Sequence, residues 1–271
     1  MKSIRPFFIL IIVFLFLGCD DDDNNITTTG DGLLIQLERA LDGLFYEWTD
    51  LSYDQDQNLI SIEIQLESFS QQTYEVTYAG GEPVSLSYTF TNTNSGNSTV
   101  TDYDIVQQGN EIVLSVGGEE AYRYGVSEGY IDYCKAFYGP NNEYFNETVF
   151  TRDADNNIQT VAYFATDASS TDLKVFEYTF SDHTSDFALP AVYNPVLDFS
   201  FTGFNAQLGE LMGLKISNQP PLQSSYWDAS GTFREENITT MPVVDDGVLQ
   251  ELSYADESTG NDNYLLRLSY N

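Results

Sequence analysis

The chain has few of the residues on which metal and thiol chemistry usually depends. Its 271 residues include one histidine, His183, and two cysteines, Cys19 and Cys134. Zinc and iron sites of the usual kind use several His or Cys ligands, so the composition excludes them. A serine triad would have to use His183, and no G-x-S-x-G nucleophile motif occurs in the chain. We therefore interpret His183 as a loop residue.

Basic residues are scarce too. Lys and Arg number 10 against 42 Asp and Glu, which gives a formal net charge of −32. After Arg5, no basic residue is the sequence neighbour of another. Nucleic-acid binding depends mainly on clustered Lys and Arg that displace counterions. We expect no nucleic-acid partner, and a charge of this sign instead favours solubility and attracts cations.

Only one long apolar run is present, from Phe7 to Leu17. Lys2 and Arg5 precede it, as in the charged and apolar regions of a secretory signal peptide. The run is too short for a membrane-spanning helix, which needs about 20 residues. We therefore predict that residues 1–18 are a signal peptide that is removed on export.

The apolar run ends at a cysteine. The segment Phe16-Leu17-Gly18-Cys19 resembles the lipobox of bacterial lipoproteins, in which the cysteine is acylated and becomes the mature N-terminus. The resemblance implies a lipid anchor on Cys19, and each acyl chain contributes about 0.8 kcal/mol per buried methylene. With Cys19 acylated, no intramolecular disulfide is available. Cys134 is then expected to be a buried, unreactive thiol.

Four aspartates, Asp20, Asp21, Asp22 and Asp23, follow the cysteine directly. They look like the acidic export signal by which many lipoproteins of the Bacteroidota reach the outer face of the outer membrane. A solvated charge run is the plainer interpretation, and both can hold together. The next residues are small and polar and bury little apolar surface. We predict that residues 19–30 are a tether that holds the protein at the cell surface through Cys19.

Beyond the tether, composition and patterning favour strands. Tyr and Phe number 19 and 18, and both are typical of strands, as are Thr, Ile and Val. Turn-forming segments repeatedly separate apolar strand residues, as in Tyr53–Leu59, Tyr78–Val84 and Val106–Ile112. Residues 37–64 fit either one amphipathic helix or three antiparallel strands. The recurring hairpins favour the strands.

The tyrosine-ended strands, the Asp/Gly/Asn turns and the segment YNPVLDF at 193–199 resemble the YD-type hairpin units of Bacteroidota lipoproteins. Those lipoproteins carry a domain of unknown function that is described as porin-like. The resemblance implies a strongly curved antiparallel sheet and supplies no catalytic residues.

We predict a mainly all-β fold in one domain, residues 31–271, with an irregular insertion at 181–226. The fold class is a large, strongly twisted antiparallel β-meander or incomplete barrel. A short helix or plug is expected near 196–216, although Gly209 and Gly213 weaken it. The residues that share one face of this helix are Leu208, Leu211, Met212 and Ile216.

Two segments place oxygen ligands in the order D-x-D-x-N. They are Asp54, Asp56 and Asn58, and Asp153, Asp155 and Asn157. Calcium prefers such ligands. Both segments lack the glycine and the final glutamate of an EF-hand loop, and Asp and Asn also stabilise ordinary turns. We conclude that no cofactor is required and that calcium is possible.

Residues 121–145 interleave eight aromatic side chains with acidic residues. Aromatic rings beside carboxylates can stack on sugar rings and bind their hydroxyls. Cross-strand packing explains the same pattern more simply. If a ligand binds here, the binding residues are Tyr122, Tyr124, Tyr130 and Tyr133.

The preferred hypothesis is a non-enzymatic, membrane-anchored outer-membrane lipoprotein that binds a glycan or an outer-membrane protein partner. One alternative is a carboxylate-based polysaccharide hydrolase, for which Glu119 and Glu120 are the best adjacent acids. With so many acidic residues, however, close pairs also arise by chance. A buried acid pair across a cleft would favour the hydrolase. A purely structural surface protein is the other alternative, and a smooth sheet without a pocket would favour it.

Overall fold

The computed structural model describes residues 33–41, 44–67, 69–138, 144–165, 173–184, 206–228, 233–245, 248–256 and 262–271. The predicted signal peptide, Cys19, the four aspartates and the YNPVLDF segment lie outside the described residues. The first eight strands are β1 (Leu34–Leu41), β2 (Leu44–Tyr53), β3 (Leu59–Leu66), β4 (Ser70–Ala79), β5 (Glu82–Asn92), β6 (Asn97–Gln108), β7 (Glu111–Val116) and β8 (Glu119–Ser127). The rest are β9 (Tyr130–Tyr138), β10 (Tyr144–Arg152), β11 (Ile158–Ala165), β12 (Leu173–Ser181), β13 (Gln223–Asp228), β14 (Phe233–Asp245), β15 (Val248–Asp256) and β16 (Asp262–Tyr270).

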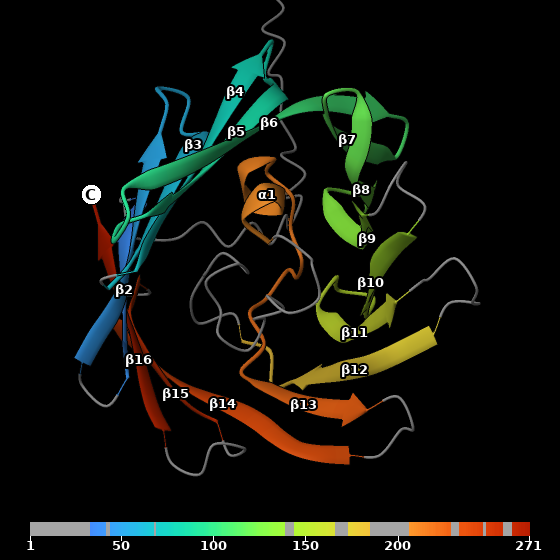
Figure 1. Cartoon of the computed structure of the whole chain (residues 1–271). Helices are drawn as coiled ribbons and strands as arrows, with labels where there is room; N and C mark the ends of the chain where they lie inside the picture. Colours follow the sequence, from blue (N-terminus) through green and yellow to red (C-terminus); the bar gives the residue numbers. More distant parts are fainter. Residues whose placement is uncertain are drawn as a thin grey trace, which may run out of the picture.

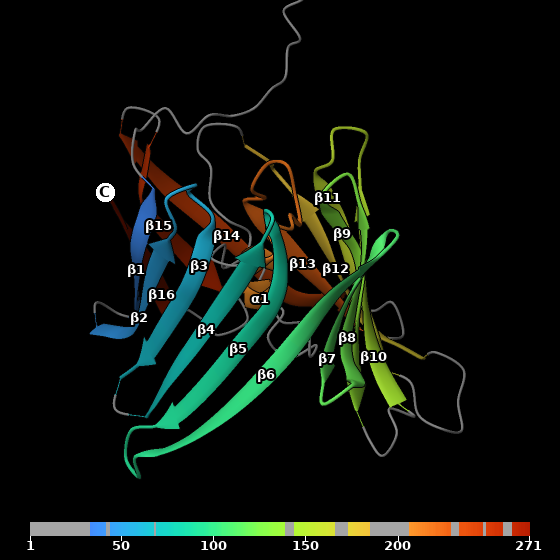
Figure 2. The same ribbon diagram turned by 90° about the horizontal axis from the view of Figure 1, so that it is seen from above.

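All strand pairs are antiparallel, and each strand pairs with its neighbours in the sequence. In addition β1 pairs with β16, so the first and last strands of the meander are joined. The described strands form one ring of pairs, which Figure 1 views along its axis and Figure 2 from the side. The predicted all-β antiparallel meander is confirmed, as are the three strands over residues 37–64.

Apolar side chains on the inner face of the ring form the core. In β3, Ile62 and Ile64 are buried, whereas the alternating residues Ser61 and Glu63 face away from the core. The same alternation continues around the ring and brings at least one apolar side chain of most strands inward. The core cluster includes Leu37, Leu86, Leu114, Tyr124, Val161 and Leu266.

A short plug fills part of the ring between β12 and β13. It contains the helix α1 (Ala206–Leu211), which lies inside the ring in Figure 1. Leu208 and Leu211 on the helix are buried, and so is Met212 directly after it. The helix ends at Leu211, because Gly213 adopts a left-handed conformation with φ of 70°. Ile216 is also buried, but it lies in the extended segment after the helix rather than on it.

The extended part of the plug is fixed to neighbouring strands. Lys215 pairs with β9 in parallel: its carbonyl accepts from Ile131 N at 2.9 Å, and its own N–H donates to Gly129 O at 2.9 Å. The hydroxyl of Tyr78 donates to Leu211 O at 2.6 Å. β13 begins at Gln223, so the last four residues of the insertion predicted at 181–226 belong to a strand. No helix in the described part of the chain is long and apolar enough to cross a membrane.

Candidate functional site

The four tyrosines predicted to form a ligand surface do not lie together. Tyr122 and Tyr124 are on the inner face of β8, and Tyr124 is fully buried beside Cys134. Tyr130 lies against the plug, where its ring is 5.3 Å from the Arg152 guanidinium. The hydroxyl of Tyr133 bonds to Glu111 on the outer face. The predicted site is therefore divided among three environments.

The inner tyrosines form part of a row that crosses several strands. Ring centroids are 4.7 Å apart for Tyr74 and Tyr88, and 6.0 Å apart for Tyr103 and Tyr122. Gln72 accepts hydrogen bonds from the hydroxyls of Tyr74 and Tyr88 at 3.2 and 3.3 Å. Burial raises the pKa of Tyr103. The rings pack against the core, which favours the packing interpretation for Tyr122 and its neighbour Tyr124.

Cys134 lies in this same inner layer. Its side chain is 2 % exposed, and burial raises the pKa of its thiol. A thiol of this kind is protonated at neutral pH and is a poor nucleophile. The predicted buried position of Cys134 is confirmed.

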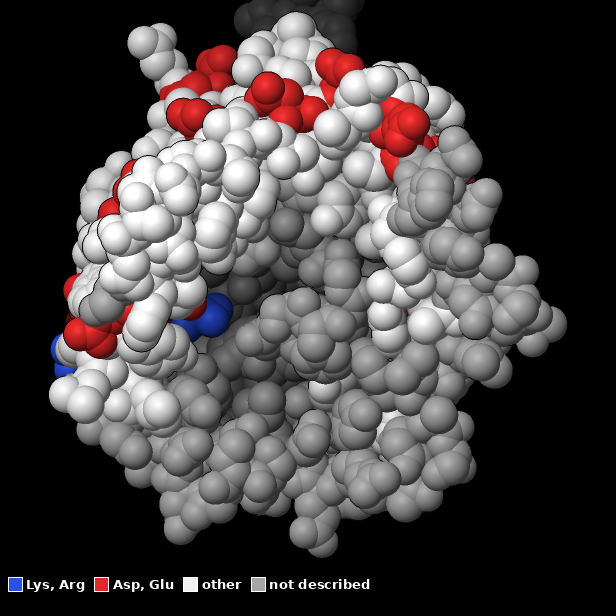
Figure 3. Space-filling view, in the orientation of Figure 1, with Lys and Arg blue, Asp and Glu red and all other residues white. Residues whose placement is uncertain are grey.

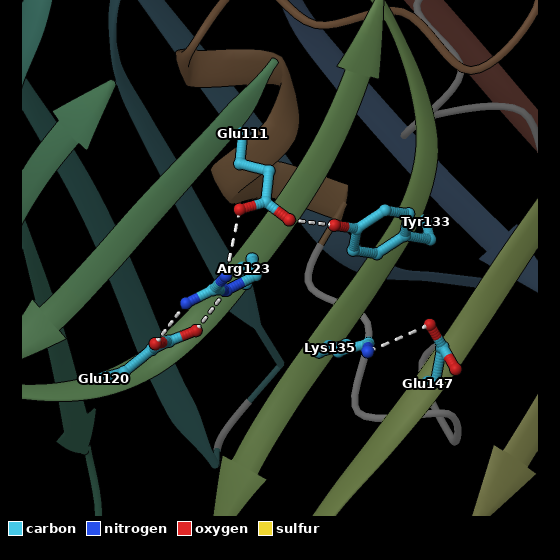
Figure 4. A network of polar contacts seen from close by, with 6 residues as sticks. All are labelled: Glu111, Glu120, Arg123, Tyr133, Lys135 and Glu147. Carbon is cyan, nitrogen blue, oxygen red and sulfur yellow. Dashed lines mark hydrogen bonds and ion pairs between the residues drawn. The ribbon is translucent and has the colours of Figure 1, made fainter. Parts of the chain in front are cut away.

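On the outer face, Arg123 joins two carboxylates (Figure 4). Its Nε and Nη2 contact both oxygens of Glu120 at 2.7 and 2.8 Å, and its Nη1 is 2.9 Å from Glu111 Oε2. Tyr133 donates to the other oxygen of Glu111. The pKa of Glu111 is lowered, chiefly by the hydrogen bond from Tyr133 and further by Arg123. Glu111 is therefore held as a carboxylate.

A second ion pair extends this network. Lys135 Nζ lies 3.5 Å from Glu147 Oε1 on the next strand and 5.6 Å from the centre of the Tyr133 ring. Burial and the neighbouring Glu111 raise the pKa of Tyr133 to about 12. Charges of both signs therefore alternate over β7 to β10. We describe Glu111, Glu120, Arg123, Tyr133, Lys135 and Glu147 together as the outer network.

One member of the outer network, Glu120, also belongs to the acid pair Glu119 and Glu120 that was considered for a hydrolase. Glu119 and Glu120 are consecutive on β8, so their side chains project to opposite sides of the strand. The two oxygens of Glu120 are bound by Arg123. A glycosidase instead needs two carboxyl groups that face one another across a cleft. The geometry of these two residues suits an ion pair that stabilises the sheet.

The two D-x-D-x-N segments form the same turn twice. In the first, Asp54 Oδ1 accepts from the backbone N–H groups of Asp56 and Asn58, both at 2.9 Å. In the second, Asp153 Oδ1 accepts from Asp155 and Asn157, again both at 2.9 Å. Hydrogen bonds from the two asparagines are the largest cause of the lowered pKa of each aspartate. The turn chemistry considered for these residues is thus present at both sites.

The second turn also holds the plug. Asn157 is buried, and its Oδ1 accepts from the backbone N–H of Gln219 at 3.0 Å. The carbonyl of Asn156 accepts from Asn218 N at 2.9 Å. Among the described residues, no group of three or more His, Cys, Asp or Glu is arranged to hold a metal. Calcium binding at either turn stays a prediction.

His183 follows β12 and is close to the second turn. It contributes to the lowered pKa of Asp153, for which the hydrogen bond from Asn157 is the main cause. Its Nε2 is buried and has no hydrogen-bond partner among the described residues. The loop position expected for His183 is confirmed, because it lies outside the strands.

A groove on the outer face of β3 to β6 was not predicted from the sequence. It encloses about 460 Å³. Ser61, Glu75, Ser87 and Asp102 stand directly opposite one another on four adjacent strands. Thr77, Ser85 and Asp104 form a second row beside the first. The only signal in the sequence is that β5 has Ser at successive outward positions, which leaves the groove between longer neighbours.

The chain was also compared with known proteins. No family model matches it, and no curated protein matches it. Among solved structures, a porin-like protein from Bacteroides vulgatus is similar over 89% of this chain and 99% of its own, with 14% identity and a TM-score of 0.48. A porin-like protein from Bacteroides uniformis is similar over 88% of this chain and 98% of its own, with 9% identity and a TM-score of 0.44. Both TM-scores are below 0.5.

Proposed function

We propose that this chain is an outer-membrane lipoprotein, anchored through acylated Cys19, that carries its β domain at the cell surface as a non-enzymatic binding or accessory module. The sequence around Cys19 and the four following aspartates motivates the anchor and the address. The fold supports the proposal through the place where the described chain begins.

Leu33 is hydrogen-bonded to Asn271, at the end of the ring where β1 begins and β16 ends. Its N–H donates to Asn271 Oδ1 at 2.8 Å, and its carbonyl accepts from Asn271 N at 3.1 Å. The hydroxyl of Tyr53 donates to Leu34 O at 2.9 Å. This double attachment is the observation that carries the proposal, because it gives a tether a defined and firmly held point of departure. The plug and the turn at 54–58 lie at this same end of the ring.

The tether sets how far the domain can lie from the membrane. Residues 19–32 form the link between the proposed anchor and Leu33. Fourteen residues span at most about 50 Å when fully extended. The domain is then held within about 50 Å of the membrane.

The outer face supports a module that works in water. Asp and Glu side chains lie along the outer edge of the ring over β4 to β7 (Figure 3). Three of the exposed acids there are Glu75, Asp102 and Asp104. A strongly anionic outer face promotes solubility and repels anionic surfaces. The proposal includes no catalytic step, and the ion-paired geometry of Glu120 is in keeping with that.

The experiment is protease accessibility on intact cells. We expect the wild-type domain to be digested, a variant with Asp20 to Asp23 replaced by Asn to be protected, and both to stay in the membrane fraction. Cys19→Ala should release the protein from membranes. Protection of the wild type, with a known surface protein digested in the same sample, would contradict the surface location. Membrane association of Cys19→Ala would contradict the anchor.

A further inference from the structure

We infer that the groove on the outer face of β3 to β6 binds a glycan without anionic groups. The inference rests on the proposed role as a binding module and names the ligand class and the site. It concerns a different face from the tyrosines that the sequence suggested.

The groove faces solvent rather than the core. Ser61, Glu75 and Ser87 are in register across three strands, and their chain neighbours Ile62, Val76 and Leu86 are buried. Residues opposite one another in a sheet share a face, so the two rows point away from the core together. Side chains from four strands therefore converge on one hollow of about 460 Å³, within the usual size of a small-ligand site.

The polar groups in the groove have no partners within the described protein. None of the seven polar side chains in the two rows, four hydroxyls and three carboxylates, takes part in a hydrogen bond or ion pair with another described residue. The outer network beside it behaves differently: Glu111, Glu120 and Glu147 each pair with Arg or Lys. In the groove, the outward donors and acceptors of the sheet therefore have no partner among the described residues.

The mixture of groups selects the ligand. A carboxylate only accepts hydrogen bonds, whereas a hydroxyl both donates and accepts. A partner for both must itself carry many groups that donate and accept, which is the chemistry of sugar hydroxyls. No Lys or Arg occurs on β3 to β6, so Glu75, Asp102 and Asp104 would repel an anionic sugar. A neutral oligosaccharide satisfies all of these conditions.

A simple cation fits less well. It would use the three carboxylates and leave the hydroxyls of Ser61, Thr77, Ser85 and Ser87 without a role. These carboxylates also do not belong to any described group arranged to hold a metal. The four hydroxyl groups in the two rows are therefore the feature that favours a glycan over an ion.

The test uses the purified full chain and calorimetric titration with neutral tetrasaccharides of glucose, mannose, galactose and N-acetylglucosamine. We expect at least one to bind with a Kd of about 10⁻⁴ to 10⁻³ M. Amide NMR should place the largest shifts at residues 85–87 and 102–104. Tetragalacturonate should not bind. Failure of every neutral sugar would overturn the inference, while the cell-surface experiments would be unaffected.

Matched variants separate the groove from the general acidity of the protein. Ser87→Phe fills the groove without changing charge and should weaken binding at least about tenfold. Thr89→Phe places the same side chain on the same face of β5, outside the groove, and should leave the Kd within about twofold. Ser85→Phe serves as a second filling variant if the first does not fold. Equal affinity in all three would overturn the inference.

Spermine provides the remaining control. If spermine shifts the same amides and no sugar does, the groove attracts cations only and the inference is wrong. If a sugar binds and Asp102→Asn with Asp104→Asn weakens it, the carboxylates accept hydrogen bonds from the sugar as inferred. Binding that survives both substitutions and Ser87→Phe would place the sugar elsewhere.

Discussion

The ring of Tyr133 lies directly over Gly125. The two residues are opposite one another on β9 and β8, and a Cβ atom built on Gly125 would overlap the ring. Across the other side of β8, Gly125 is opposite Glu111 on β7. Because Gly125 has no side chain, Tyr133 can cross β8 and donate its hydroxyl to Glu111. One glycine thus allows a link between two strands that are not neighbours.

Gly125→Ala should destabilise the fold. Alanine normally suits a strand better than glycine, so a loss of stability here can come only from the overlap with the ring. We expect a decrease of about 1–3 kcal/mol in the free energy of unfolding, measured in urea. Tyr133→Phe, which removes the hydroxyl but keeps the ring, should cost about 1 kcal/mol. An alanine variant as stable as the wild type would show that the ring moves aside without loss.

Among the residues that hold the plug, Arg152 on β10 should contribute most to the stability of the fold. Its side chain is 8% exposed, it donates to the carbonyls of Ile216 at 2.8 Å and of Ile131, and it pairs with Asp132 at 3.1 Å. Arg152→Met leaves these acceptors without a donor, which should cost about 2–4 kcal/mol. Urea unfolding measures the change, and faster hydrogen exchange at Ile131 should accompany it.

Arg267→Met is the matched control. Arg267 pairs with Glu251 at 3.0 Å, but the two side chains are 47% and 40% exposed. Exposed pairs contribute about 0–1 kcal/mol, so this substitution should change stability little. If both variants lost the same stability, burial would not be the reason for the role of Arg152.

The fold could be predicted because its signals are local. Alternating residues such as Ile60, Ile62 and Ile64, followed by turn-forming segments, specify a strand and its reversal within a few residues. The helix was predicted over too long a range, because the apolar spacing continues to Ile216 while Gly213 ends the helix. The extended segment after Gly213 reaches the core by pairing with β9, which local sequence does not encode.

The sites could not be predicted, because strand register places residues that are distant in sequence. Ser61 and Asp102 belong to one row only because three successive pairings align them. Conversely, Tyr122 and Tyr133 are close in sequence, but they lie on opposite faces of the sheet. The four predicted tyrosines therefore do not form one binding surface. Ser61, Ser85 and Ser87, which no sequence motif singled out, line a groove instead.

The twin turns offer an internal comparison. Asn58 and Asn157 make the same contacts with their aspartates, but only Asn157 also accepts from Gln219. Asn157→Ala should therefore lose more stability than Asn58→Ala, by about 1 kcal/mol for the additional bond. Urea unfolding of the two variants measures the difference. Equal losses would mean that the Gln219 contact contributes nothing.

Calcium can be tested on the same two turns. If either binds calcium, adding millimolar calcium should raise the Tm, and Asp54→Asn or Asp153→Asn should remove the rise at the turn that binds. If no rise occurs at either turn, the calcium prediction is wrong, and the two backbone hydrogen bonds that Asp54 Oδ1 and Asp153 Oδ1 each already accept would be the reason. A rise that survives both substitutions would locate calcium at another site.

The stability of the plug should depend on pH through Glu210. This residue is on α1 inside the ring, and burial raises its pKa from 4.5 to about 7, with Lys215 opposing the shift. Tyr53 on β2 and Tyr78 on β4 lie near Glu210, and its charge contributes to the raised pKa of both tyrosines. The folded state therefore favours the neutral carboxyl group more strongly than the unfolded state does.

The sign of the effect follows from that difference. Well below pH 4.5 Glu210 is neutral in both states; above that pH the unfolded state ionises first, and as the pH rises through about 7 the folded protein must accept the charge inside the ring. Stability should fall between pH 5 and pH 8 by about 2 kcal/mol in urea unfolding. The acids with lowered pKa, such as Glu111, act only at more acidic pH. Glu210→Gln should flatten the profile over this range, and an unchanged slope in that variant would assign the pH dependence to another group.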